Sequence, residues 1–188
     1  MAHAKLEQKH WMRLLQPSPV VLVTSMYRSH PNVMTAAWIT PMGFDPPLIA
    51  VGIHPGRLTH EFVTRSESFG ISIPILDLLK PVHRCGLISG REQDKFDTCG
   101  LTPIDPFEID APRIHECPAH LECGVVHRLT MTDHDLFIAE IITALADSTV
   151  FNEGWTATGD SPLIHHLAAE YYTGTTRPYA VQLEDEES

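Results

Sequence analysis

The chain has 188 residues, of which 43% are hydrophobic and 20% charged, and its formal net charge at pH 7 is −11. This length predicts a single domain over residues 1–188, and the composition is that of a globular protein rather than a disordered one. The acidic balance argues against a surface for nucleic acid or for an anionic membrane, because both need clustered Lys and Arg side chains.

Taken in chain order, the first predicted element is an amphipathic helix over residues 1–17. This segment lacks the uninterrupted apolar core of a secretory signal. Nowhere does an apolar run reach the roughly 18 residues that a membrane-spanning helix requires. A cytoplasmic protein is therefore predicted.

Four segments in the first half are predicted to be strands. Residues 19–27 are apolar and β-branched, which is typical of a strand buried on both faces. Residues 33–42 and 46–53 follow as two more strands joined by a turn, and residues 68–74 form the fourth.

Two intervening segments space their apolar residues as helices do. Residues 57–66 have one apolar side, and residues 77–88 are expected to be mostly helical but disturbed at Pro81. Further along, residues 120–132 and 134–147 are long and β-rich, and their close spacing predicts a hairpin.

These elements together predict a mainly β fold, an antiparallel barrel with flanking helices. The strands come in consecutive runs without β-α-β alternation, and no Gly-x-Gly-x-x-Gly follows a strand, so a Rossmann fold is disfavoured. The acidic end at 183–188 is expected to be disordered. The four cysteines and twelve histidines show no metal-binding spacing, so no metal site is predicted.

The first candidate binding segment is 31–41. Thr35, Ala36 and Ala37 are small residues that lead up to Trp38, whereas buried strands usually carry bulky side chains. Small side chains would let a flat ligand approach the backbone. Close strand packing in a barrel also uses small residues, and for this segment alone packing is the better explanation.

The second candidate segment is 54–62. A helix that begins at Arg57 or Leu58 would present unpaired N–H groups, and Arg57, Thr59 and His60 would add a guanidinium, a hydroxyl and an imidazole. This combination suits a phosphate group. An ordinary helix start with surface residues explains the segment equally well.

The third candidate segment has the sequence SGREQDKF, residues 89–96. Its hydroxyl, accessible amide and positive charges come from Ser89, Gly90, Arg91 and Lys95, and Asp94 is expected to orient one of the two cations. Alone, such a segment is better explained as a solvated loop with an internal ion pair.

The three segments, in this order, resemble the flavin reductase-like, FMN-binding split-barrel family, and within it the flavoredoxin-like branch. The motifs are NVMTAAW, DPP, R-x-T-H and SGR-x-x-DKF, and the resemblance runs from about Pro19 to Asp147. It implies an antiparallel, six-stranded Greek-key split barrel. It also implies noncovalently bound FMN, usually at the interface of a homodimer.

The resemblance also implies a set of flavin contacts. The isoalloxazine ring would be lined, partly by main-chain groups, by Asn32, Val33, Met34, Thr35, Ala36, Ala37 and Trp38. The phosphate end would be held by Arg57, Thr59 and His60, and the flavin covered by Ser89, Gly90, Arg91 and Lys95. We expect Lys95 to contact the ring in preference to the phosphate.

Two later segments depart from the family pattern. His134 matches the histidine of the family's Gly-Asp-His, although Thr132 replaces the glycine. The family's two glycines near the C-terminus are absent, so no role is assigned to His165, His166 or Tyr171.

The function that the resemblance implies is transfer of reducing equivalents from NAD(P)H through FMN to flavin or to a partner such as a monooxygenase component. No catalytic acid or base is assigned, because the cofactor carries the chemistry. Two alternatives stay open. One is a flavoredoxin-type electron carrier that exchanges with a redox partner without using NAD(P)H, and the other is a flavin-binding protein without turnover.

Overall fold

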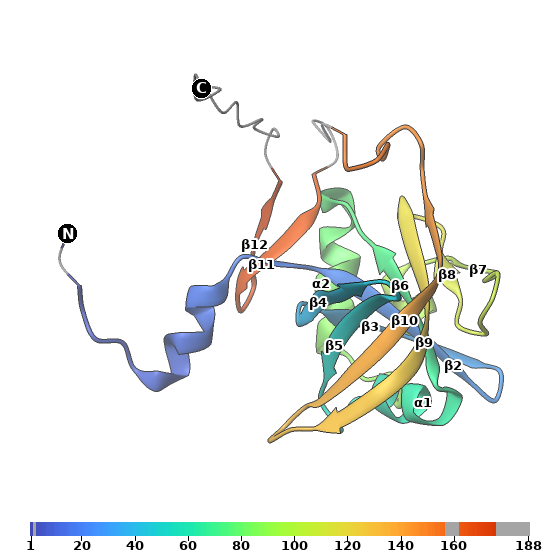
Figure 1. Ribbon diagram of the computed structural model, residues 1–188, viewed down its shortest axis with the longest axis horizontal. Helices are drawn as coiled ribbons and strands as arrows, with labels where there is room; N and C mark the ends of the chain where they lie inside the picture. The colour runs from blue at the N-terminus through green and yellow to red at the C-terminus, as the bar shows by residue number, and fades with distance from the viewer. Residues whose placement is uncertain (2, 157–161, 176–188) are drawn as a thin grey trace, which may run out of the picture.

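The structure, a computed structural model, describes residues 1, 3–156 and 162–175. The acidic end at 183–188 lies outside the described residues. A seven-stranded antiparallel sheet in the order β3-β2-β6-β9-β10-β5-β4 curves into a barrel (Figure 1). Its strands are β2 (Val21–Tyr27), β3 (His30–Ala36), β4 (Ile39–Phe44), β5 (Pro47–Ile53), β6 (Ser68–Ile73), β9 (Ala119–Thr130) and β10 (Asp135–Ala146).

The predicted antiparallel, mainly β fold is confirmed. Neighbouring strands are not always consecutive in the chain, since β6 pairs with β2 and β9, and β10 pairs with β5. Pairing between strands that are not consecutive in the chain is typical of Greek-key connections. The hairpin predicted late in the chain is confirmed as β9 and β10.

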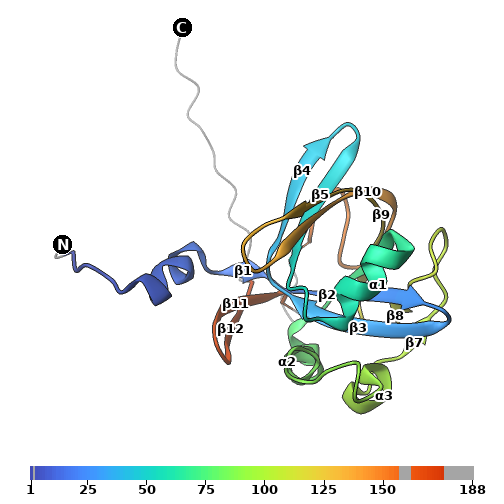
Figure 2. The same cartoon turned by 90° about the horizontal axis from the view of Figure 1, so that it is seen from below.

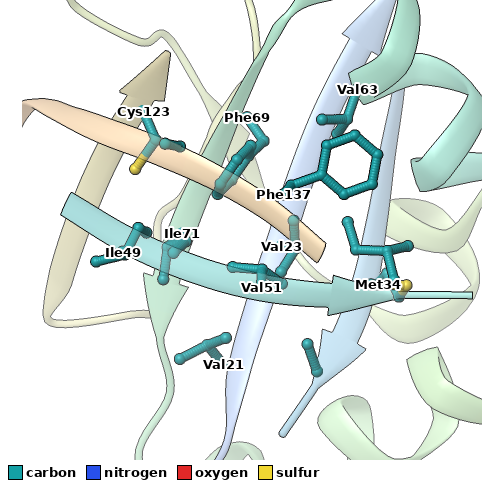
Figure 3. Close-up of a cluster of buried hydrophobic side chains, with 13 residues drawn as sticks. Val21, Val23, Met34, Ile49, Val51, Val63, Phe69, Ile71, Cys123 and Phe137 are labelled. Atoms are coloured by element: carbon teal, nitrogen blue, oxygen red, sulfur yellow. The ribbon is translucent and has the colours of Figure 1, made fainter. Parts of the chain in front are cut away.

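The barrel interior is a closely packed apolar core. Side chains from six strands meet there, including Val23, Val51, Phe69, Ile71 and Phe137 (Figure 3). Each lies on the inward side of its strand, as the period of two in a strand requires. These residues fill the interior of the barrel.

A second apolar layer covers the outer side of β2 and β3. The helices α2 (Leu79–Leu87) and α3 (Lys95–Cys99) pack there (Figure 2). Val82 and Phe96 of these helices join one apolar cluster with Leu22 and Val33. The prediction that the strand at 19–27 is buried on both faces is thus confirmed for β2.

The strand predicted over 33–42 is wrong in its extent, because the chain forms two strands there. β3 pairs with β2 at one edge of the sheet, whereas β4 pairs with β5 at the other edge. Ala37 and Trp38 connect the two edges, and the Trp38 carbonyl accepts a hydrogen bond from the Gly52 N–H at 2.9 Å. The barrel is split at this connection.

The predicted helices are present with two corrections. α1 (Leu58–Ser66) lies at one end of the barrel (Figure 2). Pro81 does not disturb α2, because it is the third residue of that helix, where an N–H has no intrahelical acceptor to lose. Near the N-terminus the regular structure is a 3-10 helix, η1 (Gln8–Leu15), which stands away from the barrel and buries no residue (Figure 1).

The remaining short elements are β1 (Ser18–Pro19), η2 (Leu76–Leu78), β7 (Pro103–Ile104), β8 (Arg113–Ile114), β11 (Ile164–Ala168) and β12 (Tyr171–Gly174). β11 and β12 form a hairpin beside β1 that the sequence did not predict. None of the helices in the described ranges is long and apolar enough to cross a membrane.

Candidate functional site

A cavity of about 580 Å³ opens where the barrel is split, and its volume is typical of small-molecule sites. We call it the large cavity. It includes most of the residues that were expected to line the flavin ring. Its lining residues are Met34, Thr35, Ala36, Ala37, Trp38, Gly52, Ile53, His54, Gly56, Arg57, His134 and His166.

The large cavity combines a wall of small residues with an aromatic wall. Ala36 and Ala37 add only methyl groups, which leaves the backbone near the end of β3 within reach of a ligand. Trp38 is 48% exposed, and its ring centroid lies 4.6 Å from that of His134. His54 meets His134 edge-on, with 5.4 Å between the ring centroids. Such a pair of walls suits a flat aromatic ligand.

A second, smaller cavity of about 50 Å³ adjoins the first at the start of α1. The two share three lining residues, namely Met34, Gly56 and Arg57. The small cavity is lined by Asn32, Met34, Gly56, Arg57, Leu58, Thr59, Ile88, Ser89, Gly90 and Lys95. All three candidate segments therefore meet here, and the first two, 31–41 and 54–62, also line the large cavity.

The start of α1 gives the small cavity a positive character. Arg57 is the N-cap residue, and no side chain caps the first N–H groups of the helix. Free N–H groups and the helix dipole both favour an anion at this position.

Lys95 strengthens that positive character from the other side. Its side chain is 5% exposed and its Nζ donates a hydrogen bond to the Cys85 carbonyl at 2.8 Å. Within the described ranges no carboxylate forms an ion pair with it. Burial lowers the pKa of Lys95, and the nearby Arg57 guanidinium lowers it further. A buried ammonium group without a counter-ion is costly, and an anion beside it would offset this cost.

Asn32, Thr59 and Gly90 pack tightly at the base of the small cavity. Asn32 Nδ2 donates to Thr59 Oγ1 at 2.7 Å, and both side chains are buried. A Cβ atom on Gly90 would overlap Asn32 Oδ1. The backbone at Gly90 can therefore approach Asn32 this closely only because glycine has no side chain.

Three predicted site residues point elsewhere. Val33 is buried in the apolar layer under α2 and α3. His60 is buried with its Nε2 2.8 Å from Asp135 Oδ2, so it lines neither cavity. Arg91 forms an ion pair with Glu61, with 2.9 Å between Nη1 and Oε2.

Asp94 also has a different role from the expected one. Its carboxylate accepts hydrogen bonds from the N–H groups of Phe96 and Asp97 at 2.8 and 3.2 Å, and it thereby caps α3. It orients neither Arg91 nor Lys95.

The sequence did not single out several lining residues. His54 and Gly56 belong to the segment His-Pro-Gly, whose turn-forming residues before α1 were a detectable signal. His166 comes from the β11–β12 hairpin, where its ring lies 5.2 Å from that of Tyr172. In the described part of the chain, no group of three or more His, Cys, Asp or Glu side chains could hold a metal ion.

The buried Asp135 predicts a pH-dependent stability. Hydrogen bonds from His60 and Arg128 lower the pKa of Asp135 below its ordinary value of 3.8. A carboxyl with a lower pKa in the folded state stabilises the fold above its unfolded pKa, and this contribution is lost as the pH falls through the folded pKa. Asp135→Asn should therefore lower the free energy of unfolding by about 1–3 kcal/mol at neutral pH.

The difference between wild type and Asp135→Asn should shrink and disappear as the pH falls below 3.8, the ordinary pKa of the group. Urea denaturation of both proteins across this pH range measures the difference. A loss of stability that is equal at every pH would contradict the ionic role of Asp135.

A split antiparallel barrel with an anion-compatible pocket at the split defines a class of small-molecule-binding β proteins. The chain belongs to the family of the flavin reductase like domain, whose model matches residues 12–174. This confirms the resemblance seen in the sequence motifs.

Relatives and solved structures agree with this assignment. An uncharacterized protein of Archaeoglobus fulgidus is 36% identical over 72% of this chain and 76% of its own length. An NADH-dependent FAD reductase of Streptomyces globisporus is 30% identical over 68% of this chain and 69% of its own.

Two solved structures have closely similar folds. The flavoredoxin of Desulfovibrio vulgaris has a TM-score of 0.81 at 29% identity and covers 91% of this chain and 93% of its own. An FMN-binding domain of a flavin reductase-like enzyme from Shewanella baltica has a TM-score of 0.80 at 30% identity, with 95% and 97% covered.

Proposed function

We propose that the protein is a flavoprotein that binds FMN noncovalently and passes reducing equivalents from NAD(P)H to free flavin or to a partner acceptor in the cytoplasm. The observation that carries this proposal is the buried Lys95 ammonium, which has no carboxylate partner among the described residues and lines a small cavity beside the large cavity with its aromatic wall. Both features fit FMN, which joins a flat ring system to a phosphate.

The two cavities divide the tasks of holding FMN. The phosphate end would be held by Arg57, Thr59, Ser89 and Lys95 together with the backbone at Gly90. The ring would lie against the wall from Met34 to Trp38, with His134 on the aromatic side. FMN, when bound, would supply the hydride and electron chemistry that amino-acid side chains lack.

NAD(P)H as the donor is supported by the Streptomyces globisporus relative, which is an NADH-dependent FAD reductase. The similarity to a flavoredoxin supports the second candidate, an electron carrier that receives electrons from another redox protein. A partner such as a monooxygenase component belongs to the first candidate. Both candidates need the same FMN site, and they differ in whether NAD(P)H reduces it.

Spectra and titrations test this function. The purified protein is expected to be yellow or to take up one FMN per subunit, and to bind FMN far more tightly than riboflavin because the phosphate meets cations and a helix start. Anaerobic addition of NADH or NADPH should then bleach the flavin absorbance. Failure to bind FMN in calorimetry would refute the flavoprotein proposal. FMN binding without bleaching by NADH or NADPH would favour the electron carrier over the NAD(P)H-dependent flavoprotein.

We also propose a homodimer, because the outer face of the protein carries many exposed apolar side chains. The outward side of β10 carries Leu136 and Ile138, which border Gly52 and Ala50 of β5, and Ile142 is 51% exposed. The free 3-10 helix η1 adds further exposed apolar residues, namely Trp11, Met12, Leu14 and Leu15. A second subunit would cover such a face.

Light scattering tests the dimer by measuring the molar mass of the wild type and of a variant with a charge on this face. The wild type is expected to be dimeric at micromolar concentration, and Ile142→Asp should shift it toward monomer because a buried unpaired carboxylate is costly. Leu87→Asp is the control, since Leu87 is exposed at the end of α2 and away from β10. A monomeric, FMN-loaded wild type would rule the dimer out.

A further inference from the structure

An ionic cluster of the buried Asp135 and His60 with the partly exposed Arg128 lies at the start of α1. One oxygen of Asp135, Oδ2, lies 2.8 Å from His60 Nε2, 2.7 Å from Arg128 Nε and 2.6 Å from Arg128 Nη2. We call these three residues the clamp. An ionised carboxylate only accepts hydrogen bonds, so both basic residues donate to it. None of the three lines either cavity.

The clamp joins two elements that are far apart in the chain. His60 lies in the first turn of α1, whereas Asp135 begins β10 and Arg128 lies near the end of β9. A second link to α1 comes from Arg128, whose Nη1 lies 3.4 Å from Thr64 Oγ1. α1 is therefore attached to the β9–β10 hairpin at two positions, one turn apart.

Both joined elements end at the candidate site. Next to His60 in α1 is Thr59, which lines the small cavity. Next to Asp135 is His134, whose ring packs at a tilt against Trp38 in the large cavity. The His60 ring also packs edge-on against Phe137 inside the barrel, with 5.3 Å between the ring centroids. The clamp thus determines how the start of α1 is placed relative to the aromatic wall.

We infer that Asp135, through His60 and Arg128, is a positioning residue that holds the start of α1 in the orientation required for binding a phosphate group. A carboxylate buried at this position is costly unless it is fully hydrogen-bonded. Its contact with His60 joins the hairpin to the helix, and its two contacts with Arg128 hold the carboxylate within the hairpin. The inference rests on the proposed function, because the phosphate concerned is that of FMN.

The inference makes a prediction whose sign is opposite to that of a simple charge effect. Asp135→Ala removes a negative charge and frees two basic residues near the phosphate end, so Coulomb attraction alone would tighten FMN binding. If the clamp positions α1, FMN binding should instead weaken. Riboflavin has no phosphate, so its affinity should change little.

Calorimetric Kd values for FMN and riboflavin in one set of variants provide the test. For Asp135→Ala and for His60→Phe, which keeps a ring against Phe137, the ratio of the riboflavin Kd to the FMN Kd should fall about tenfold, the size of one weakened charge-assisted hydrogen bond. Asp135→Asn keeps an acceptor oxygen and should retain most of the wild-type ratio.

Glu122→Ala is the matched control. Glu122 is also a fully buried carboxylate of the hairpin, and its oxygens accept hydrogen bonds from the N–H groups of Phe107 and Glu108 at 2.8 and 2.6 Å. It lines neither cavity. Its loss should lower the melting temperature and leave the ratio of the two Kd values unchanged, which separates positioning from general stability.

The outcomes separate the two proposals. If the wild type binds no FMN, the proposed function falls and this inference falls with it. If the wild type prefers FMN and that preference is unchanged or stronger in folded Asp135→Ala, the positioning role alone is overturned. If Asp135→Ala does not fold, His60→Phe decides by the same ratio, and hydrogen exchange of the hydrogen-bonded α1 amides, from Glu61 onward, should be faster in it than in the wild type.

Discussion

Replacing Lys95 with Met is expected to weaken FMN binding and at the same time to stabilise the protein without FMN. Lys95 is buried, and its Nζ donates one hydrogen bond, to the Cys85 carbonyl. In the proposed complex its ammonium group meets the phosphate, a charge-assisted contact of about 1.5–3 kcal/mol, so the Kd for FMN should rise about 10- to 150-fold. Without FMN, an apolar side chain avoids the cost of burying the charge and should raise the melting temperature.

The same variant tells which end of the flavin Lys95 contacts. Lys95 lines the small cavity with Arg57 and Thr59 and does not line the large one. We therefore now expect phosphate contact, although the sequence favoured ring contact. Phosphate contact weakens oxidised and reduced FMN alike and leaves the midpoint potential nearly unchanged, whereas ring contact lowers the potential.

Calorimetry, thermal unfolding and a redox titration of Lys95→Met measure these quantities. Lys80→Met, on the exposed side of α2, removes a charge that lines neither cavity and should change none of them. Unaltered FMN affinity in Lys95→Met would remove Lys95 from the site.

The second large effect is expected for Gly90→Ala. The new methyl group would overlap Asn32 Oδ1, and the Asn32 side chain is buried and bonded to Thr59. Asn32 must then move or the loop must retreat, at a cost of about 1–3 kcal/mol. Either movement distorts the small cavity, so FMN affinity and the melting temperature should fall together.

Gly86→Ala is the matched control for that change. Gly86 lies in α2, and a Cβ there would make an ordinary contact at 3.7 Å from Thr35 Cβ. Alanine is the better helix former by about 0.5–1 kcal/mol, so this variant should be slightly more stable and should bind FMN as before. Equal effects of the two substitutions would show that Gly90 has no special packing role.

The local pattern of the sequence was sufficient for many of the elements around the site. The apolar runs predicted β2 and β5, the 3.6-residue spacing predicted α1, and the two long β-rich runs predicted the β9–β10 hairpin. These features depend on contacts between residues close in the chain, or on which side of an element is apolar. Arg57 and Thr59 were predicted as phosphate ligands from a short polar segment at the start of such an element, whereas Lys95 was expected at the ring.

Only the tertiary structure decided where the predicted strand at 33–42 divides, because β3 and β4 pair with different strands at opposite edges of the sheet. It likewise decided the partner of His60. The imidazole could have faced a phosphate or a carboxylate, and Asp135, which is 75 residues away in the sequence, lies within 2.8 Å of it. The β11–β12 hairpin that brings His166 to the large cavity depends in the same way on its pairing with β1. Local periodicity determines which residues face inward, but the partner that a buried polar group finds depends on long-range packing, which a single sequence does not display.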